Sequence, residues 1–560
     1  MITPINTQRE RYDWLTEESQ VMLERGYLLE GENVDDAVRR VANAAGKYYK
    51  GTALEGVEEQ FYDLISYGYL SLASPIWANM GTVRGLPISC FGSYVGDSVS
   101  SIVDCHSEAA MMSKLGGGTS GYFGDLRPRG AKITGNGTSN GPVSFMKMFD
   151  TMVNVVSQGN VRRGAFAAYM NVEHADIEEF LEIKSIGNDI QNLFYGVTIS
   201  DQWMEEMIGG DMDKRRVMAK IIKSRQEKGL PYIMFSDTVN NNTVDVYKDK
   251  GMRIHNSNLC TEIALPNGLD ESFVCCLASI NLERWDEIEG KGYIPMMIYF
   301  LDAVMQEFID KSEEQSFLTK ARKFAMRHRA LGLGVMGWHS YLQSRDLPFD
   351  CLTSTILNKN IWKEIQAESM RGSTVLAEVM GEPELLKGYG RRNTTLNTIA
   401  PTTSSASILG QVSPGIEPVN SNYFTVGLSH GNFTRKNKYL VALLDRKGEN
   451  TAEVWKSIML MQGSVQHLDF LTEDEKEVFK TFKEINQYGI VQQAADRQQF
   501  IDQSQSVNLN IPPSASPKEV NGLIIQAWRQ QVKTLYYQRS QSVAQGLANT
   551  MNAECSACAG

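Results

Sequence analysis

Apolar residues recur at intervals of three and four positions near the start of the chain. The segments DDAVRRVANAAGKYY and GVEEQFYDLISYGYL show this spacing most clearly. Apolar positions at this interval fall on one face of an α-helix. The pattern therefore predicts helices from about residue 8 to residue 72, and residues 1–73 are taken as a helical N-terminal region.

From Ser74 onward the pattern changes to short apolar runs that Gly, Ser, Asn and Pro interrupt. Longer helical patterns alternate with these runs, for example DIEEFLEIK, SDQWMEEMIGG, DKRRVMAKIIKSRQEKG and YIPMMIYFLDAVMQEFIDKSEEQ. Strand-like runs between long helices are typical of α/β folds with parallel strands. No repeat with a period of about 20–50 residues and no linker divides this part, so residues 74–543 are expected to form one α/β domain.

The composition narrows the class of protein. The chain has 560 residues, of which 42% are apolar and 22% are charged, and its net charge of −11 gives no general attraction to nucleic acid or to an anionic membrane. There is no run of about 18 apolar residues and no cleavable leader pattern, so a cytoplasmic protein is expected. Eight cysteines are too few for a disulfide-stapled secreted fold. In a reducing compartment such thiols are either buried or reactive.

Polar, thiol and carboxylate side chains alternate in the segment Asn258-Leu259-Cys260-Thr261-Glu262. In an extended segment alternate side chains share a face, whereas on a helix they would diverge. The extended interpretation predicts a three-group site with an amide, a redox-capable sulfur and a general acid or base. The alternative is a half-buried strand end in which the cysteine has no function.

The motif Cys555-Ser556-Ala557-Cys558 lies in a small, polar segment, residues 544–560, that predicts a flexible tail. A CxxC motif is half of a zinc site or a redox dithiol. No second CxxC lies nearby and the seven histidines show neither HxxxH nor ExxH spacing, so no metal site is predicted in this chain. A dithiol on a flexible tail could enter a site and then swing out to a reductant. A functionless end is the alternative.

Three loops have compositions that suit a ligand. Residues 400–407, APTTSSAS, carry five hydroxyls before an apolar segment and predict a phosphate-binding helix N-terminus, with ordinary capping as the alternative. Residues 116–118 (GGG) and 158–164 (QGNVRRG) would allow a ligand to approach the backbone closely. In contrast, GLGVMG at 332–337 follows a basic helical pattern instead of a strand, so a nicotinamide site is rejected there.

Together these motifs resemble the large subunit of class I ribonucleotide reductases, from about residue 8 to the C-terminus. The most specific match is NLCTE, residues 258–262. The resemblance implies that Cys260 becomes a thiyl radical that takes the 3′ hydrogen of a ribose. Glu262 would be the base at the 3′ hydroxyl, and Asn258 would hold that hydroxyl. The reducing thiols are assigned to Cys90, in PISC, and to Cys275, in VCCLAS, where the next residue is an additional cysteine.

This family receives its radical from a metal cofactor in a separate small subunit. Adjacent aromatics such as Tyr536 and Tyr537 ordinarily indicate strand packing, but the resemblance implies that they pass the radical on. Cys555 and Cys558 would reduce the active-site disulfide and would in turn be reduced by a thioredoxin- or glutaredoxin-like partner. Other members space these tail thiols differently.

The same match implies a substrate site and an effector site. The residues implied around the substrate diphosphate and base are Ser74, Ser89, Gly117, Gly118, Pro401, Thr402, Thr403, Ser404 and Ser405. The family often has an acidic residue where this chain has Thr403. The residues implied at an allosteric specificity site for dNTP or ATP effectors with Mg²⁺ are Asp97, Arg127, Gln158 and Arg162. The last two lie on a loop that would couple the effector to substrate choice.

The resemblance also implies a fold and partners. The expected fold is a ten-stranded α/β barrel, made of two five-stranded parallel half-barrels, with Cys260 on a central finger loop. Many relatives begin with an additional domain that switches activity with ATP or dATP. This chain starts after that point, so specificity control without an overall switch is expected. The expected partners are the small subunit, ribonucleoside diphosphates and a second copy in a nucleotide-dependent homodimer, in the cytoplasm of a cell or of a virus host.

Four alternatives remain at this point. The cobalamin-dependent class shares the thiyl cysteine and the reducing pair, but the tyrosine pair favours class I. The glycyl-radical class lacks support because no glycyl-radical segment is recognisable near the C-terminus. A nucleotide-binding regulator without activity would retain the fold but not the chemistry. A generic thiol oxidoreductase would explain only the terminal CxxC.

Overall fold

The computed structural model describes residues 2–158, 164–428 and 431–540. The N-terminal region contains three helices, which are α1 (Glu17–Glu24), α2 (Val34–Gly46) and α3 (Glu58–Ser66). Sequence periodicity predicted these helices correctly but failed at both ends of the region. Residues 8–15 are turn and irregular structure, and β1 (Leu70–Leu72) is a fully buried strand. Every position of β1 is buried because it pairs with a strand of the following domain.

Five parallel strands form the first half of a barrel. Each is joined to the next by a connection that contains at least one helix, and the strands lie side by side in chain order. The strands are β2 (Cys90–Tyr94), β3 (Thr119–Tyr122), β4 (Phe166–Asn171), β5 (Phe194–Ile199) and β6 (Tyr232–Phe235). The helices between them are α5 (Val99–Lys114), α6 (Pro142–Val155), α7 (Ile177–Leu181), α8 (Asp201–Gly209) and α9 (Met212–Lys228).

The second half is also parallel and begins with β7 (Phe273–Asn281) and β8 (Leu331–Met336). Residues 397–399 pair in parallel with β8 and with Gln505, so two further extended segments continue the sheet. The last segment contains β12 (Thr534–Leu535) and β13 (Gln538–Arg539), and β13 runs parallel to β11 (Leu509–Asn510).

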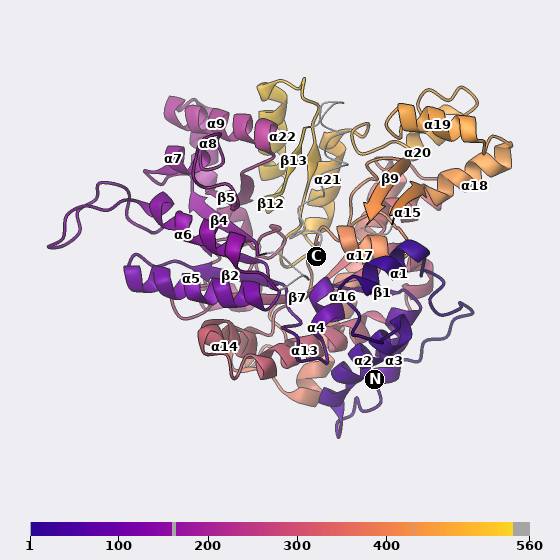
Figure 1. Cartoon of the computed structure of the whole chain (residues 1–560), viewed down its shortest axis with the longest axis horizontal. Coiled ribbons are helices and arrows are strands. Elements are labelled where there is room, and N and C mark those ends of the chain that lie inside the picture. The colour runs from indigo at the N-terminus through magenta and orange to yellow at the C-terminus, as the bar shows by residue number, and fades with distance from the viewer. Residues whose placement is uncertain (1, 159–163, 429–430, 541–560) are drawn as a thin grey trace.

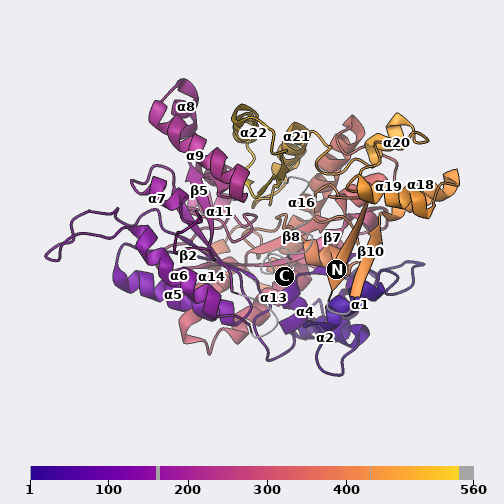
Figure 2. The same cartoon turned by 45° about the horizontal axis from the view of Figure 1, so that its top comes forward.

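The two halves close on each other at two antiparallel seams. β7 pairs with β2, and β12 pairs with β6. The ring therefore has five parallel segments on each side, which confirms the expected barrel of two five-stranded halves. Helices surround it on the outside (Figures 1 and 2).

The remaining helices cover the second half-barrel and build a small outer lobe. The long helices outside the second half are α13 (Ile294–Lys311), α14 (Thr319–His328), α16 (Leu352–Met380), α21 (Gln487–Gln498) and α22 (Pro517–Arg529). The outer lobe, with its own apolar core, contains α18 (Lys438–Lys447), α19 (Ala452–Leu460) and α20 (Glu473–Val478). The shorter elements are α4 (Ser74–Asn79), α10 (Ser236–Asn241), α11 (Asp245–Asp249), α12 (Trp285–Ile288), α15 (Trp338–Gln343), α17 (Thr403–Ile408), β9 (Tyr423–Leu428) and β10 (Gly431–Lys436).

The first two glycines of the GxGxxG sequence lie within strand β8, where they serve packing, and Gly337 follows the end of the strand. A Cβ atom on Gly334 would lie 2.4 Å from the carbonyl oxygen of Thr398 on the adjacent segment. The basic pattern before it forms α14, as the sequence indicated. The close approach of two barrel strands therefore explains why a glycine is needed at this position, and no bound nucleotide is required to explain it.

Among the described residues, none of the helices combines the length and apolar character that a bilayer crossing demands.

Candidate active site

The segment that carries Cys260 is a loop held inside the barrel by both halves. The hydroxyl of Tyr169, on β4, donates a hydrogen bond to the carbonyl of Asn258 at 2.7 Å. From the other half, the backbone N–H of Ser504 donates to the carbonyl of Glu262 at 2.9 Å. Contacts to opposite walls define this segment as the expected central finger loop.

The finger loop is a turn and not the extended segment that alternation in the sequence predicted. Thr261 has a φ of 66°, in the left-handed region that β-branched residues rarely adopt. The side-chain oxygen of Asn258 accepts the backbone N–H of Ile263 at 3.2 Å and so braces the turn. The side chains of Asn258, Cys260 and Glu262 nevertheless line one cavity, so the prediction that they converge is correct although its geometric reason is wrong.

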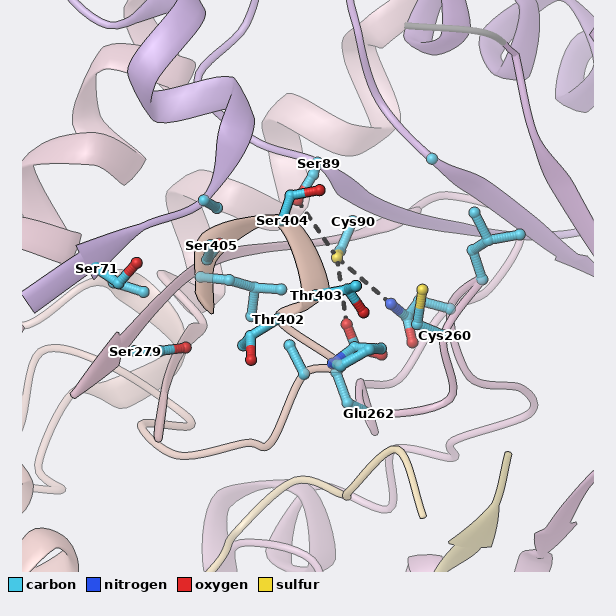
Figure 3. A pocket seen from close by; sticks show the side chains of 18 residues that line it. Ser71, Ser89, Cys90, Cys260, Glu262, Ser279, Thr402, Thr403, Ser404 and Ser405 are labelled. Carbon is cyan, nitrogen blue, oxygen red and sulfur yellow. Dashed lines mark hydrogen bonds between the residues drawn. The ribbon is translucent and has the colours of Figure 1, made fainter. Parts of the chain in front are cut away.

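The cavity lies between the finger loop, strands β1 and β7, the start of β2 and a hydroxyl-rich loop (Figure 3). It holds about 650 Å³ of empty space, including its open mouth. Its described lining residues are Ser71, Ala73, Ser89, Cys90, Gly118, Asn258, Leu259, Cys260, Glu262, Leu277, Ala278, Ser279, Ala400, Pro401, Thr402, Thr403, Ser404 and Ser405. A wall of hydroxyls thus faces a wall of sulfur, amide and carboxyl groups.

Cys90 joins these two walls. Its sulfur accepts a hydrogen bond from the amide nitrogen of Asn258 at 3.3 Å, and its thiol donates to the carboxyl of Glu262 at 3.8 Å. The hydroxyl of Ser89 lies 3.6 Å from the same sulfur. Figure 3 shows these three contacts as dashed lines. A proton could therefore move between the Cys90 thiol and the Glu262 carboxyl without a large rearrangement.

Glu262 is a buried carboxyl poised near neutrality. Burial raises the pKa of its side chain to about 7, because the charged form is poorly solvated inside the barrel. Hydrogen bonds from Asn258, Ser506 and Cys90 lower the pKa and so limit this rise. A carboxyl with a pKa near 7 can act either as a base or as an acid under physiological conditions.

Cys275 lies directly opposite Cys90 across the seam between the half-barrels. The two residues are Cα partners in the antiparallel β2–β7 register, so their side chains project from the same face. Cys276 points to the other side of β7, where its thiol donates to the carbonyl of Leu301 in α13 at 3.3 Å. Of the two adjacent cysteines, only Cys275 is therefore positioned to form a disulfide with Cys90.

Tyr536 and Tyr537 form an aromatic cluster with Tyr232 of β6. The ring centroids of the adjacent tyrosines lie 4.3 Å apart, and that of Tyr232 lies 4.8 Å from Tyr536. The same segment touches the finger loop, because the hydroxyl of Thr534 donates to the carbonyl of Thr261 at 3.1 Å. The tyrosine cluster and the finger loop are thus parts of one connected assembly.

The hydroxyl-rich loop, residues 401–405, leads into the short helix α17 and supplies its N-cap and first turn, as its composition predicted. Thr402 has a φ of 53°, and its hydroxyl accepts the backbone N–H of Gly415 at 2.6 Å. This bond fixes the loop at the rim of the cavity. Sequence reasoning missed Ser71 and Ser279, which are cross-strand partners on β1 and β7 and line the same cavity. Their pairing could not be known without the register of β1.

Two predicted substrate residues lie just behind the lining. The hydroxyl of Ser74, at the start of α4, accepts a hydrogen bond from the hydroxyl of Tyr27 at 3.1 Å. Gly117 packs against Phe91, whose ring would lie 2.4 Å from an added Cβ atom. Among the described residues, Ser89 and Gly118 line the cavity, whereas Ser74 and Gly117 do not.

Of the predicted effector residues, Asp97 and Arg127 form an exposed ion pair away from the cavity. Arg127 donates through Nε to the carboxylate of Asp97 at 2.8 Å. Gln158 is buried and donates to the side-chain oxygen of Asn79 at 3.1 Å. Arg162 lies outside the described residues.

Cys555 and Cys558 also lie outside the described residues. None of the cysteines within them, which include the three near the cavity, forms a disulfide. Within the described ranges, no group of three or more His, Cys, Asp or Glu side chains is arranged to hold a metal ion.

Comparison with known proteins agrees with this geometry. The family model described as the ribonucleotide reductase barrel domain matches residues 88–212, 206–385 and 382–538, and the model of the all-alpha domain matches residues 13–85. The ribonucleoside-diphosphate reductase large subunit of Invertebrate iridescent virus 3 is 32% identical over 566 residues, covering 87% of this chain and 88% of its own. A sequence from Frog virus 3 (isolate Goorha), provisionally named as such a large subunit, is 36% identical over 502 residues, covering 86% and 87%.

A solved structure is similar over almost the whole chain. The class Id ribonucleotide reductase alpha subunit of Actinobacillus ureae matches with a TM-score of 0.91 and 48% identity. The match covers 98% of this chain and 100% of that one, and it favours class I over the cobalamin-dependent alternative. The barrel, the finger loop and these matches together show that the chain belongs to the ribonucleotide reductase family, as a ribonucleoside-diphosphate reductase large subunit.

Proposed function

We propose that this chain reduces the 2′ carbon of ribonucleoside diphosphates by thiyl-radical chemistry centred on Cys260. The observation that carries the proposal is the convergence of Cys260, Glu262 and Cys90 on one cavity that faces a hydroxyl-lined wall. A sugar bound there would meet a radical, a base and a reductant together. Glu262 and Cys90 are buried in the barrel, which limits their contact with bulk water and so protects a radical beside them from side reactions.

The first step activates the 3′ position of the ribose. The Cys260 thiyl radical takes the 3′ hydrogen atom, which leaves a sugar radical and the Cys260 thiol. Glu262, in its carboxylate form, accepts the proton of the 3′ hydroxyl, and Asn258 holds the oxygen. A carboxyl with a pKa of about 7 exchanges this proton readily at neutral pH.

The second step removes the 2′ hydroxyl and reduces the sugar. Cys90 gives its proton to the departing hydroxyl, so water leaves. Cys90 and Cys275 then supply two electrons and form a disulfide, the Cys275 proton ends on the product, and Glu262 returns its proton to the 3′ oxygen. Cys260 returns its hydrogen atom to the 3′ carbon and becomes the thiyl radical again. The sum is one ribonucleotide and two thiols converted to one deoxyribonucleotide, one water and one disulfide.

The radical reaches Cys260 through the tyrosine cluster. Large subunits of this family work with a small subunit, and the metal cofactor of that subunit supplies the oxidising equivalent. Tyr536 and Tyr537 accept it and pass it to Cys260. The proposal is supported by the 4.3 Å separation of their ring centroids and by the hydrogen bond that links their segment to the finger loop.

Three further features complete the proposal. Cys555 and Cys558 reopen the disulfide and are reduced by a thioredoxin- or glutaredoxin-like protein, in a reducing compartment such as the cytoplasm. The diphosphate binds at the hydroxyl-lined wall, whose residues 401–405 and Ser89 offer donors. dNTP or ATP effectors with Mg²⁺ bind beside Asp97 and Arg127 in a homodimer, and the loop with Gln158 and Arg162 relays their identity.

Replacement of the proposed radical residue tests this function. Cys260→Ser should bind nucleotide with wild-type affinity and form no deoxynucleotide when it is assayed with the small subunit. Cys351→Ser is the matched control, because that sulfur caps α16 and lies off the cavity. Turnover in Cys260→Ser would refute the proposal. Turnover of the wild-type chain with adenosylcobalamin and no second protein would instead place it in the cobalamin class.

A further inference from the structure

Each turnover leaves a disulfide that an incoming thiolate must open, and the two sulfurs differ in accessibility. Cys90 lines the cavity and keeps 7% of its surface exposed, whereas Cys275 is 0% exposed and is absent from the described lining. In thiol–disulfide exchange the nucleophile attacks one sulfur and expels the other as a thiolate. A thiolate that enters through the cavity can therefore reach Cys90, and Cys275 becomes the leaving group.

A buried leaving thiolate needs a hydrogen-bond donor. Gln503 provides one, since its amide nitrogen donates to the sulfur of Cys275 at 3.4 Å. The same nitrogen donates to the carbonyl of Leu331 at 2.8 Å, and the amide oxygen accepts the backbone N–H of Ala264 at 3.1 Å. The side chain is fully buried and has partners at both ends. These partners fix the amide so that its nitrogen faces the sulfur.

The rest of the surroundings oppose a charge on Cys275. Burial raises the pKa of this thiol well above its ordinary value, and Cys276, Cys90 and Glu262 raise it further. The hydrogen bond from Gln503 acts in the opposite direction. A hydrogen bond to a charged acceptor is worth more than one to a neutral acceptor, so the donor favours the thiolate over the disulfide sulfur.

We propose that Gln503 is a catalytic residue of the regeneration step, which stabilises Cys275 as the leaving thiolate when a dithiol attacks Cys90. In the first exchange a thiolate forms a bond to the Cys90 sulfur, the Cys90–Cys275 bond breaks, and Cys275 leaves with the electron pair. In the second exchange the other thiol of the dithiol closes its own disulfide and expels Cys90 as a thiolate. Protons from solvent then restore both thiols. This inference rests on the proposed roles of Cys90 and Cys275 as the reducing pair.

The second exchange has a matching donor. The amide nitrogen of Asn258 lies 3.3 Å from the Cys90 sulfur. Each leaving sulfur thus has one carboxamide donor, supplied by the finger loop for Cys90 and by the strand segment behind it for Cys275. Gln503 therefore acts in the first exchange and Asn258 in the second.

The direction of attack is tested on the wild-type chain. Enzyme oxidised by one turnover is mixed with 2-mercaptoethanol, quenched in acid within a second, alkylated and mapped by mass spectrometry. We expect the mercaptoethanol adduct on Cys90 and the alkyl group on Cys275. An adduct on Cys275 would overturn the inference. Absence of any Cys90–Cys275 disulfide after turnover would overturn the proposed function instead, so the two failures are distinguishable.

The donor is tested by Gln503→Met, which keeps the volume of the side chain and removes the N–H group. Reduction of the oxidised variant by dithiothreitol should be about tenfold slower than in the wild type. Gln505→Met is the control, because Gln505 is equally buried two residues further on but bonds to residues of α21, including Ala494. It should show the wild-type rate. If Gln503→Met does not fold, as judged by nucleotide binding, Gln503→Asn serves, with a shorter amide and an intermediate rate. A wild-type rate in a folded Gln503 variant would refute the donor role.

Discussion

Replacing the Glu262 carboxyl with an amide should stabilise the protein while it abolishes turnover. The carboxyl is fully buried, and its pKa is raised from 4.5 to about 7 by burial. Because the folded state holds the proton more tightly than the unfolded chain, ionisation of the unfolded chain lowers the free energy of unfolding as pH rises from 4.5 toward 7. Above about pH 7 this loss in the free energy of unfolding stays constant, because the carboxyl is then ionised in both states. Glu262→Gln carries no such penalty because its amide does not ionise.

The size of the effect follows from the shift in pKa. One pKa unit corresponds to about 1.4 kcal/mol, so the full penalty is about 3 kcal/mol at pH 8 and about 1 kcal/mol at pH 5. With an unfolding entropy of about 2 cal/mol/K per residue, a chain of this length should melt about 2–3 °C higher at pH 8 as Glu262→Gln than as the wild type. At pH 5 the difference should fall below about 1 °C.

Differential scanning calorimetry at the two pH values measures this difference, and a coupled assay with the small subunit measures turnover. Asp302→Asn is a control of opposite sign, because Arg329 and Arg392 hold the pKa of the buried Asp302 carboxyl below its ordinary value. Its removal leaves two buried guanidinium groups unpaired and should destabilise the chain by about 3–5 kcal/mol at neutral pH. Equal melting temperatures of Glu262→Gln and wild type at pH 8, or full turnover in the variant, would contradict the reasoning.

Other predictions concern the thiols, the radical path and the effector. Cys275→Ala should stop turnover, whereas Cys276→Ala should retain it within about twofold of wild type, which steady-state assays will decide. Tyr536→Phe and Tyr537→Phe should each lower turnover by more than about 100-fold without changing nucleotide affinity, and appreciable activity in either would exclude that ring from the path. Arg127→Ala should weaken dNTP binding in equilibrium dialysis at least about tenfold while it leaves turnover without effector unchanged; unaltered binding would remove Arg127 from the effector site.

The fold was predictable as a class from hydrophobic patterning alone, but its closure was not. Alternating strands and helices indicated an α/β domain with parallel strands. The antiparallel seams depend on contacts between segments far apart in the chain, such as β2 with β7, and no local pattern encodes them. β1 was assigned to a helix for the same reason, since three buried residues in a row fit either element until their partner is known.

The candidate site was predictable to the extent that its chemistry is carried by unusual residues in short motifs. NLCTE drew attention to Asn258, Cys260 and Glu262, and the structure brings them to one cavity. The choice between Cys275 and its neighbour needed the strand register. Ser71, Ser279 and Gln503 are common residue types in plain sequence surroundings, so only their positions in space make them candidates.

The proposed radical path depends on the hydrogen bonds that hold the finger loop as much as on the aromatic rings. Ser506 and Thr534 donate hydroxyl hydrogen bonds to the carbonyls of Cys260 and Thr261, so the strand that precedes the tyrosines and the strand beside it both hold the finger loop. A radical transfer is sensitive to small changes in distance, and a loop turn in a strained conformation would drift without such ties. The left-handed φ of Thr261 is therefore maintained by the same two barrel segments that position the tyrosine pair. This coupling explains how a turn unsuited to a β-branched residue can persist at the centre of the barrel.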